Sequence, residues 1–257
     1  MTPAITIQAL GDNFIFLCEH EKDKVFVVDP GGSTPVLGVI RQRGLKVTEI
    51  LVTHHHGDHT GGVAELKHKT GCRVIGSDRQ RMPDADCIVN DREVLTIGNT
   101  HVQVIATPGH TRTSVCYYAQ PSNNNQSGIL WTGDTLFTGG CGRLLECDAQ
   151  SMWRSLQNLA SLPDNTLVYC GHDYAVENYE FALKIEPNNP AVMRRLAELK
   201  QAQNQGRQTV PSTMLQEKIT NPFLRADAAG LKSALGMVGA ATVDVFAELR
   251  RRKDQTV

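Results

Sequence analysis

The chain of 257 residues is long enough for one large domain, or for one domain with an appended piece, and for a hydrophobic core that needs no disulfides. With 40% hydrophobic and 21% charged residues, its composition is globular and excludes disordered and collagen-like classes. The 26 basic and 27 acidic residues leave a net charge of -1, which argues against nucleic acid or an anionic membrane as a partner.

Two features predict the compartment. The N-terminal MTPAITIQALGDN has no positively charged region, and no apolar run approaches the roughly 20 residues that a bilayer span requires. The cysteines are odd in number and form no C-x-x-C pair, which fits a reducing compartment better than a disulfide scaffold. We therefore expect a cytoplasmic chain. Separately from these features, we expect it to be a monomer.

Up to about residue 172, short strands alternate with helices. The strand candidates are β-branched or aromatic-rich runs bounded by turn residues, at 25–28, 50–52, 73–75, 101–106, 114–118, 129–131 and 167–169. Helical periodicity predicts helices over 34–43, 62–69 and 149–162. The polar stretch 122–127 is predicted to be a loop between two strands. The pattern predicts a mixed α/β domain over residues 1–172.

After Gly171 the helical period dominates. Helices are predicted over 174–185, 191–203 and 242–252. Pro-Asn-Asn-Pro at 187–190 separates the first two. We expect an α-helical domain over residues 173–257.

The most informative segment is THHHGDH, which directly follows the apolar strand 50–52. Its pattern is His54-x-His56-x-Asp58-His59, and a chain of this composition would produce it by accident on the order of one time in a thousand. Imidazole and carboxylate are ligands that Zn²⁺, Fe and Mn²⁺ accept. Side chains 54 and 56 share a direction in an extended segment, whereas 58 and 59 diverge. Two adjacent ions are therefore easier to build than one.

Three further donors stand beside a glycine after a strand. They are His110, Asp134 and His172. Glycine permits a tight turn at a strand end, so each donor can reach one edge of a sheet. A single Gly-His or Gly-Asp is more often an ordinary turn, but the joint occurrence with the histidine motif favours ligands.

The remaining histidines and two of the cysteines are expected to be surface or packing residues. We expect His20, His68 and His101 to be ordinary surface residues. Strand alternation points His55 away from the metals. Cys141 and Cys170 are expected to be small packing residues.

In this order, THHHGDH, TPGH, TGDT and CGHDY resemble the metallo-β-lactamase superfamily, whose fold is an αββα sandwich with metals at one sheet edge. The resemblance implies one ion on His54, His56 and His110. It implies a second ion on Asp58, His59 and His172, with Asp134 bridging. Catalytic roles for Asp58 and Asp134 follow from it. Asp29 in VVDPGG matches the acidic residue that supports the ligand loop.

Longer segments point to one branch of that superfamily. DTLFTGGCGRLLE, GHDYAVENYEFALKIEPNNP, NPFLR and RRRKDQ together resemble glyoxalase II, the hydroxyacylglutathione hydrolases, nearly end to end. The resemblance implies hydrolysis of S-D-lactoylglutathione to D-lactate and glutathione, the second step of methylglyoxal detoxification. A hydroxide shared by two metals suits this reaction, because a metal lowers the pKa of water to about 7. The thiolate leaves without a strong acid, because its conjugate acid has a pKa of about 8.5.

The resemblance also implies a glutathione site made of Arg143, Tyr174, Arg250 and Lys253. Arg250 and Lys253 are spaced i, i+3 on the last predicted helix and could reach one carboxylate of the peptide. The alternative is that RRRK is only a solvated helix end. Leu145 departs from the family, because some members carry an aromatic hydrogen-bond donor there.

Other functions stay open on the sequence alone. A mononuclear iron persulfide dioxygenase of the same superfamily could use equivalent ligands, and a metal-dependent binding module would need the water position blocked. Zinc is the expected metal, with iron and manganese as alternatives, because nitrogen and oxygen ligands do not choose among them.

Overall fold

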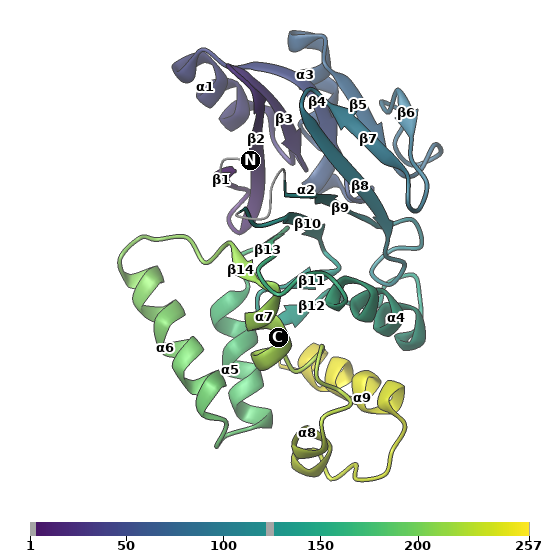
Figure 1. Cartoon of the computed structure of the whole chain (residues 1–257), viewed down its shortest axis with the longest axis vertical. Helices are drawn as coiled ribbons and strands as arrows, with labels where there is room; N and C mark the ends of the chain where they lie inside the picture. The colour runs from purple at the N-terminus through teal and green to yellow at the C-terminus, as the bar shows by residue number, and fades with distance from the viewer. Residues whose placement is uncertain (1–3, 122–125, 257) are drawn as a thin grey trace. The chain divides into compact units, whose positions relative to one another are not determined.

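The computed structural model describes residues 4–121 and 126–256, and the chain forms two compact units whose elements are labelled in Figure 1. Unit 1 comprises Met1–Ala106 and Thr113–Gly133. Unit 2 comprises Thr107–Arg112 and Asp134–Val257. This division does not test the predicted domain boundary between residues 172 and 173, which stays a prediction.

The first sheet of unit 1 has six strands in chain order: β1 (Ile5–Ala9), β2 (Asn13–Glu21), β3 (Lys24–Val28), β4 (Lys46–Leu51), β5 (Arg73–Gly76) and β6 (Cys87–Ile88). The first three strands pair antiparallel, and β3 to β6 pair parallel. The parallel pairs need crossover connections, which contain α1 (Ser33–Arg43), α2 (Gly57–Thr60) and α3 (Val63–Thr70). Apolar residues of α1 and α3 pack with those of the strands into one buried core.

The second sheet contributes four antiparallel strands to unit 1: β7 (Val94–Ile97), β8 (Thr100–Ala106), β9 (Val115–Ala119) and β10 (Ile129–Gly133). Every residue of β9 and β10 is buried. The two sheets face each other, because the rings of Phe26 and Trp131 pack edge to face at 5.3 Å. The Tyr117 hydroxyl also donates a 3.0 Å hydrogen bond to the Val52 carbonyl.

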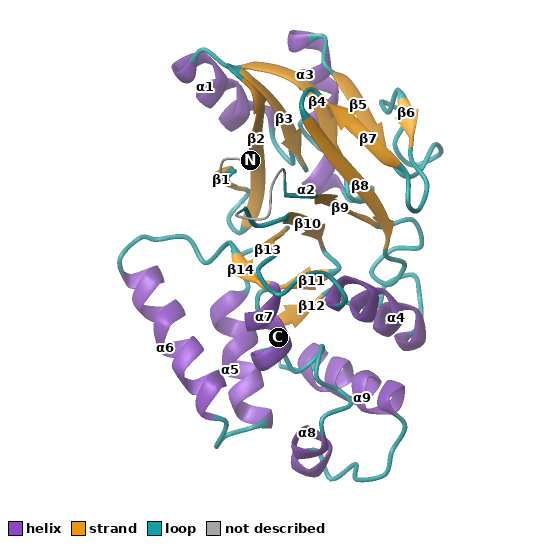
Figure 2. Cartoon of the chain, viewed as in Figure 1, coloured by secondary structure: helices purple, strands orange, loops and turns teal. Residues whose placement is uncertain are grey.

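Unit 2 is mainly helical (Figure 2). Its elements are β11 (Leu136–Phe137), β12 (Gly140–Cys141), α4 (Ala149–Ala160), β13 (Leu167–Cys170), α5 (Ala175–Ile185), α6 (Pro190–Asn204), β14 (Ser212–Thr213), α7 (Met214–Thr220), α8 (Ala229–Ala234) and α9 (Thr242–Asp254). Local signals set these helices: Asp148 caps α4, and Asn189 caps α6 with a proline at its start. The pairs β11–β12 and β13–β14 are antiparallel.

The predicted elements are confirmed, with boundaries that differ by a few residues. The sequence patterns predict none of β1, β2, β6, β7, β11, β12, β14, α7 and α8. The first six residues of β2 are all buried, so the polar alternation that marks a half-buried strand is absent there. The sequence predicts no helix at α2, because four residues are too few to show a helical period. Residues 122–125 of the predicted polar loop lie outside the described residues.

His20, which is expected to be an ordinary surface residue, is only partly exposed. It lies on β2, is half-buried, and its Nε2 stands 2.7 Å from Thr48 Oγ1. Burial lowers the pKa of this imidazole. The side chains of His68 and His101 are exposed, as expected.

Cys141 and Cys170 are buried packing residues, as predicted, and burial raises the pKa of their thiols to about 11 and about 12. Within residues 4–121 and 126–256, no helix is both long and apolar enough to cross a bilayer.

Candidate metal centre

The histidine motif begins where β4 ends, and Asp29 organises its first residue. The Thr53 amide donates to Asp29 Oδ1 at 2.7 Å, and the Thr53 hydroxyl donates to Oδ2 at 2.6 Å. Asp29 is 3% exposed, so the low-dielectric surroundings strengthen these charge-assisted bonds. The backbone entering the motif is therefore fixed by a buried carboxylate.

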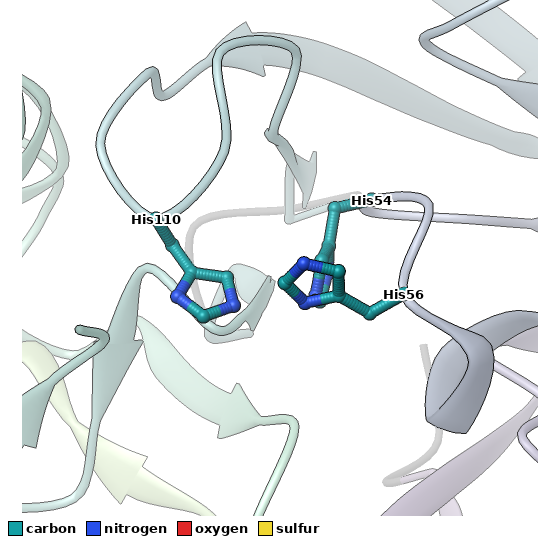
Figure 3. A group of neighbouring side chains, drawn as sticks. All are labelled: His54, His56 and His110. Atoms are coloured by element: carbon teal, nitrogen blue, oxygen red, sulfur yellow. The ribbon is translucent and has the colours of Figure 1, made fainter. Parts of the chain in front are cut away.

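His54 and His56 bring two ring nitrogens together (Figure 3). His54 Nε2 lies 3.0 Å from His56 Nδ1, and the ring centroids are 4.6 Å apart at 78°. Two neutral lone pairs at this distance repel each other unless a proton or a cation lies beside both. The arrangement fits a metal ion bound by these two nitrogens.

Asp58 and His59 lie on α2, so helical rather than extended geometry separates their side chains. His59 Nδ1 is 3.0 Å from Asp29 Oδ2. A carboxylate is an acceptor, so this contact places the proton on Nδ1 and leaves the Nε2 lone pair available to a metal. Asp58 is held by Asn13, whose amide donates to its carbonyl at 3.1 Å and its carboxylate at 3.2 Å.

A close backbone approach fixes the position of α2. A Cβ atom at Gly31 would lie 1.9 Å from the Asp58 carbonyl oxygen, so only glycine fits there. Any side chain at residue 31 would push Asp58 and His59 out of place. The VVDPGG segment thus contributes both the carboxylate that orients His59 and the space that α2 occupies.

His55 has a different partner from its neighbours in the motif. Its Nε2 accepts from the Arg81 guanidinium at 3.2 Å, and Arg81 is ion-paired with Asp78. His55 is also absent from the groups of described residues that could hold a metal ion. The sequence-based assignment of His55 away from the ligands agrees with this placement.

In unit 2 the Asp134 carboxylate stands between two histidines. His110 Nε2 lies 3.4 Å from Asp134 Oδ2, and His172 Nε2 lies 3.4 Å from Asp134 Oδ1. All three side chains are nearly buried. Each carboxylate oxygen thus serves a different histidine, which is the geometry that a carboxylate bridging two ions requires.

The tautomer of His110 is set by its own backbone partner. His110 Nδ1 donates to the Arg143 carbonyl at 2.9 Å, which leaves Nε2 free of a proton. The ring projects from the loop between β8 and β9 (Figure 3). A metal ligand whose other nitrogen is held by a carbonyl is pre-oriented for binding.

Tyr174 packs beside the same cluster. Its ring stacks on His172 with centroids 4.9 Å apart and planes 4° from parallel, and it meets the Phe137 ring edge-on at 5.5 Å. The Tyr174 ring thus limits how far the His172 side chain can rotate.

Two other residues that the sequence analysis singles out lie at the surface. The Arg143 side chain is exposed, and Leu145 is 52% exposed.

Arg250, in contrast, is committed to internal contacts. It is 6% exposed and donates to the Cys141 carbonyl at 2.8 Å. Its guanidinium also pairs with Asp254 at 2.8 Å and lies 5.2 Å from the Phe223 ring centroid. The structure therefore gives Arg250 a packing and hydrogen-bonding role, and its contact with glutathione stays a prediction.

Lys253 is less tightly held than Arg250. Its Nζ donates a long 3.4 Å hydrogen bond to the Glu177 carbonyl and lies 5.7 Å from the Phe181 ring. Partial burial lowers the pKa of its ammonium group. Its binding role also stays a prediction.

Two known families match adjoining parts of the chain and together cover residues 10–256. The family described as Metallo-beta-lactamase superfamily matches residues 10–172, and the one described as Hydroxyacylglutathione hydrolase C-terminus matches residues 173–256. The described histidine and aspartate donors, on this fold, mark a site for divalent metal ions.

Curated relatives cover the whole chain. A hydroxyacylglutathione hydrolase of Chromohalobacter salexigens is 44% identical over 99% of this chain and 100% of its own length. One of Methylococcus capsulatus is 41% identical over 99% of this chain and 98% of its own. Among solved structures, ETHE1 from Myxococcus xanthus superposes with a TM-score of 0.68 at 22% identity, covering 97% of this chain and 90% of that chain.

Proposed function

The chain belongs to the hydroxyacylglutathione hydrolase family, the glyoxalase II thioesterases, and from this we propose that it hydrolyses S-D-lactoylglutathione to D-lactate and glutathione. The observation that carries the proposal is the full-length match to relatives of this name, which includes the helical C-terminal part. The ETHE1 likeness, at 22% identity, concerns the fold alone and favours no second activity.

The family matches also support the proposed division of the chain. They meet between residues 172 and 173. We assign residues 1–172 to a metal-binding catalytic domain and residues 173–257 to a helical domain that binds the glutathione part of the substrate.

For the metal centre we propose two ions, with zinc as the natural choice for this donor set and iron or manganese as alternatives. His54, His56 and His110 would hold one ion, and Asp58, His59 and His172 would hold the other, with Asp134 as the ligand proposed to be shared by both. The proton positions support this assignment, because Asp29 and the Arg143 carbonyl hold the Nδ1 protons of His59 and His110. Both rings then offer Nε2 as the ligand atom.

Metal ions bound there would lower the pKa of water to about 7 and polarise a thioester carbonyl. The protein holds the ligands in place. Asp58 and Asp134 supply the carboxylates, and the buried Asp29 keeps His59 in the tautomer that can bind. The glutathione thiolate needs no acid to leave, since its conjugate acid has a pKa of about 8.5. Arg143, Tyr174, Arg250 and Lys253 form the proposed glutathione site.

A purified, zinc-loaded protein tests the function directly. It should release free thiol from S-D-lactoylglutathione and leave a cephalosporin intact. Oxygen uptake with glutathione persulfide by the same protein loaded with Fe(II) would instead indicate the dioxygenase, because zinc has no redox chemistry, and binding of the thioester by the zinc-loaded protein without turnover would indicate a binding module. Either outcome without thioester hydrolysis would overturn the proposal.

Lys253 gives a prediction on substrate binding. Lys253→Ala should raise KM about tenfold and leave kcat within about twofold, because a charge-assisted bond to a substrate carboxylate is worth about 1.5 kcal/mol at a partly exposed site. Steady-state kinetics measure both constants. Lys218→Ala, which removes a lysine paired with Asp164, is the matched control and should leave KM unchanged. A fall in kcat at constant KM would contradict a binding role.

Arg250 should behave differently from Lys253. Arg250→Ala strands the buried Cys141 carbonyl and opens space beside Phe223, so the free energy of unfolding should fall by about 2 to 4 kcal/mol. Chemical denaturation of the metal-loaded protein measures this. A variant of unchanged stability would show that the Cys141 contact contributes little.

The cellular compartment and the oligomeric state of the enzyme are also proposals. All seven cysteines are free thiols, and most are buried, which supports a reducing compartment such as the cytoplasm. We propose that the chain acts there as a monomer on a small-molecule glutathione thioester.

A further inference from the structure

The backbone between Asp134 and Arg143 forms a short hairpin in unit 2. We call residues 134–143 the ligand hairpin; it contains β11, β12 and the turn between them. One end carries the aspartate that stands between two histidines, and the other carries the carbonyl that holds His110. The position of this hairpin therefore sets two of the proposed metal ligands at once.

The two arms of the ligand hairpin pack closely against each other near those ligands. The Gly142 amide donates to the Thr135 carbonyl at 3.3 Å. A Cβ atom at Gly142 would lie 1.9 Å from the Asp134 carbonyl oxygen and 3.2 Å from the His110 Cβ. A shift of the returning arm would therefore displace both Asp134 and His110.

Three buried polar side chains of the proposed helical domain, residues 173–257, hold the turn of the ligand hairpin. We call them the polar clamp: Asn178 of α5, Glu217 of α7, and Asn221 at the end of α7. Their exposed fractions are 4%, 0% and 0%. Buried polar groups of this kind cost free energy unless each finds a partner.

Their partners are backbone groups of consecutive turn residues. Asn178 Nδ2 donates to the Thr138 carbonyl at 3.2 Å, and Asn221 Nδ2 donates to the Gly140 carbonyl at 3.0 Å. Glu217 Oε2 accepts from the Gly139 amide at 2.8 Å and from Asn221 Nδ2 at 3.0 Å.

The clamp is matched to this turn in shape as well. A Cβ atom at Gly139 would lie 2.5 Å from the Tyr179 ring, and one at Gly140 would lie 2.5 Å from Asn178 Nδ2. Gly139 has a φ of 73°, the left-handed region that favours glycine. Two adjacent glycines thus let the turn sit directly against α5, within hydrogen-bond reach of the clamp.

Glu217 is an unusual residue for a purely structural role. It is fully buried, and burial raises the pKa of its carboxyl group. A well-packed apolar side chain is often at least as stable in such a position, so stability alone gives little reason for a carboxylate. A carboxylate does offer what the turn needs, which is an acceptor aimed at the Gly139 amide and at Asn221.

We infer that Asn178, Glu217 and Asn221 are positioning residues for the proposed metal ligands Asp134 and His110, acting through the ligand hairpin. The helical domain then has a second role besides binding glutathione, because it holds two of the proposed metal ligands in position. This inference rests on the proposed metal centre, but it concerns metal affinity and does not depend on the substrate.

The test compares variants by their affinity for Zn²⁺ in a chelator competition, with the full-length protein and no substrate. Glu217→Ala should weaken Zn²⁺ binding about 10-fold to 100-fold, the usual effect of removing a residue that orients metal ligands. Glu217→Gln should bind within about threefold of wild type. The amide oxygen can still accept from Gly139 and Asn221, and the Ser212 hydroxyl, now 2.5 Å from Oε1, can turn to accept from the new NH₂ group.

The matched control is Glu186→Ala. Glu186 is an almost buried carboxylate at the end of α5, and it accepts hydrogen bonds from both terminal guanidinium nitrogens of Arg225 and from no hairpin atom that the structure describes. It should lower the melting temperature about as much as Glu217→Ala while leaving Zn²⁺ affinity within about threefold of wild type. Equal loss of Zn²⁺ affinity in both variants would show that the polar clamp contributes only to the general stability of the protein, and it would overturn the inference.

Asn178→Ala keeps the test decisive if Glu217→Ala does not fold. It removes one hydrogen bond, to the Thr138 carbonyl, and should weaken Zn²⁺ binding several-fold while hydrogen exchange at Gly139 speeds up. Unchanged Zn²⁺ affinity would overturn the inference. Because no measurement in this test needs the substrate, a wild-type protein that binds zinc but fails to hydrolyse S-D-lactoylglutathione would overturn the proposed function and leave this inference standing.

Discussion

Replacing Asp134 by alanine is expected to lower kcat/KM for S-D-lactoylglutathione by more than about 100-fold and to reduce the metal content below two ions per chain. The carboxylate contacts His110 Nε2 with one oxygen and His172 Nε2 with the other, both at 3.4 Å. Its removal takes one ligand from each proposed ion at the same time. Elemental analysis of the purified variant and a thioester assay measure the two effects.

The control for this prediction is Asp164→Ala. Asp164 is also an aspartate of unit 2, but its side chain is 60% exposed and pairs with Lys218. Loss of an exposed ion pair costs about 0 to 1 kcal/mol, so this variant should keep its metal and its turnover. An Asp134→Ala protein that retains two ions and normal turnover would contradict the proposal that Asp134 is a ligand of both ions.

Much of the proposed metal site is predictable from the sequence because its signals are local. A run of apolar residues ending in a glycine or proline turn marks a strand end, and the donors at 110, 134 and 172 each follow such a run. The helices with clear caps and periodic apolar residues are predictable for the same reason. Short or fully buried elements carry no such periodic signal, which is why α2 and β2 were missed.

The supporting contacts are not predictable, because their partners are far apart in the chain. Glu217 bonds Gly139 across 78 residues, and Arg250 bonds the Cys141 carbonyl across 109. The basic run RRRK predicts a cationic helix end, yet its first arginine is turned inward and nearly buried. No sequence pattern distinguishes an arginine that binds a ligand from one that serves a backbone carbonyl.

Asp29 is a buried carboxylate that contacts the histidine motif without being one of the proposed metal ligands. Its two oxygens accept from the Thr53 amide, the Thr53 hydroxyl and His59 Nδ1, all at 3.0 Å or less. It also holds a φ of 50°, a conformation that aspartate and asparagine tolerate better than most residues. Asparagine is therefore the substitution that keeps the backbone and the volume while changing only the hydrogen bonding.

With Asp29→Asn, one of the two oxygens becomes an NH₂ group. If the oxygen stays with the Thr53 amide, the NH₂ group faces His59 Nδ1, which must then accept, so that the proton moves to Nε2 and blocks the ligand atom. We therefore expect Asp29→Asn to fold with a nearly unchanged melting temperature while losing about 10-fold to 100-fold in metal affinity and in kcat/KM. Nitrogen NMR shifts of His59 in the metal-free protein would report the tautomer directly, with Nδ1 protonated in wild type and Nε2 protonated in the variant. Wild-type metal affinity together with a moved proton would show that His59 is not a ligand. Wild-type affinity with an unmoved proton would show only that the His59 ring tolerates the amide, because the NH₂ group would then have turned toward Thr53.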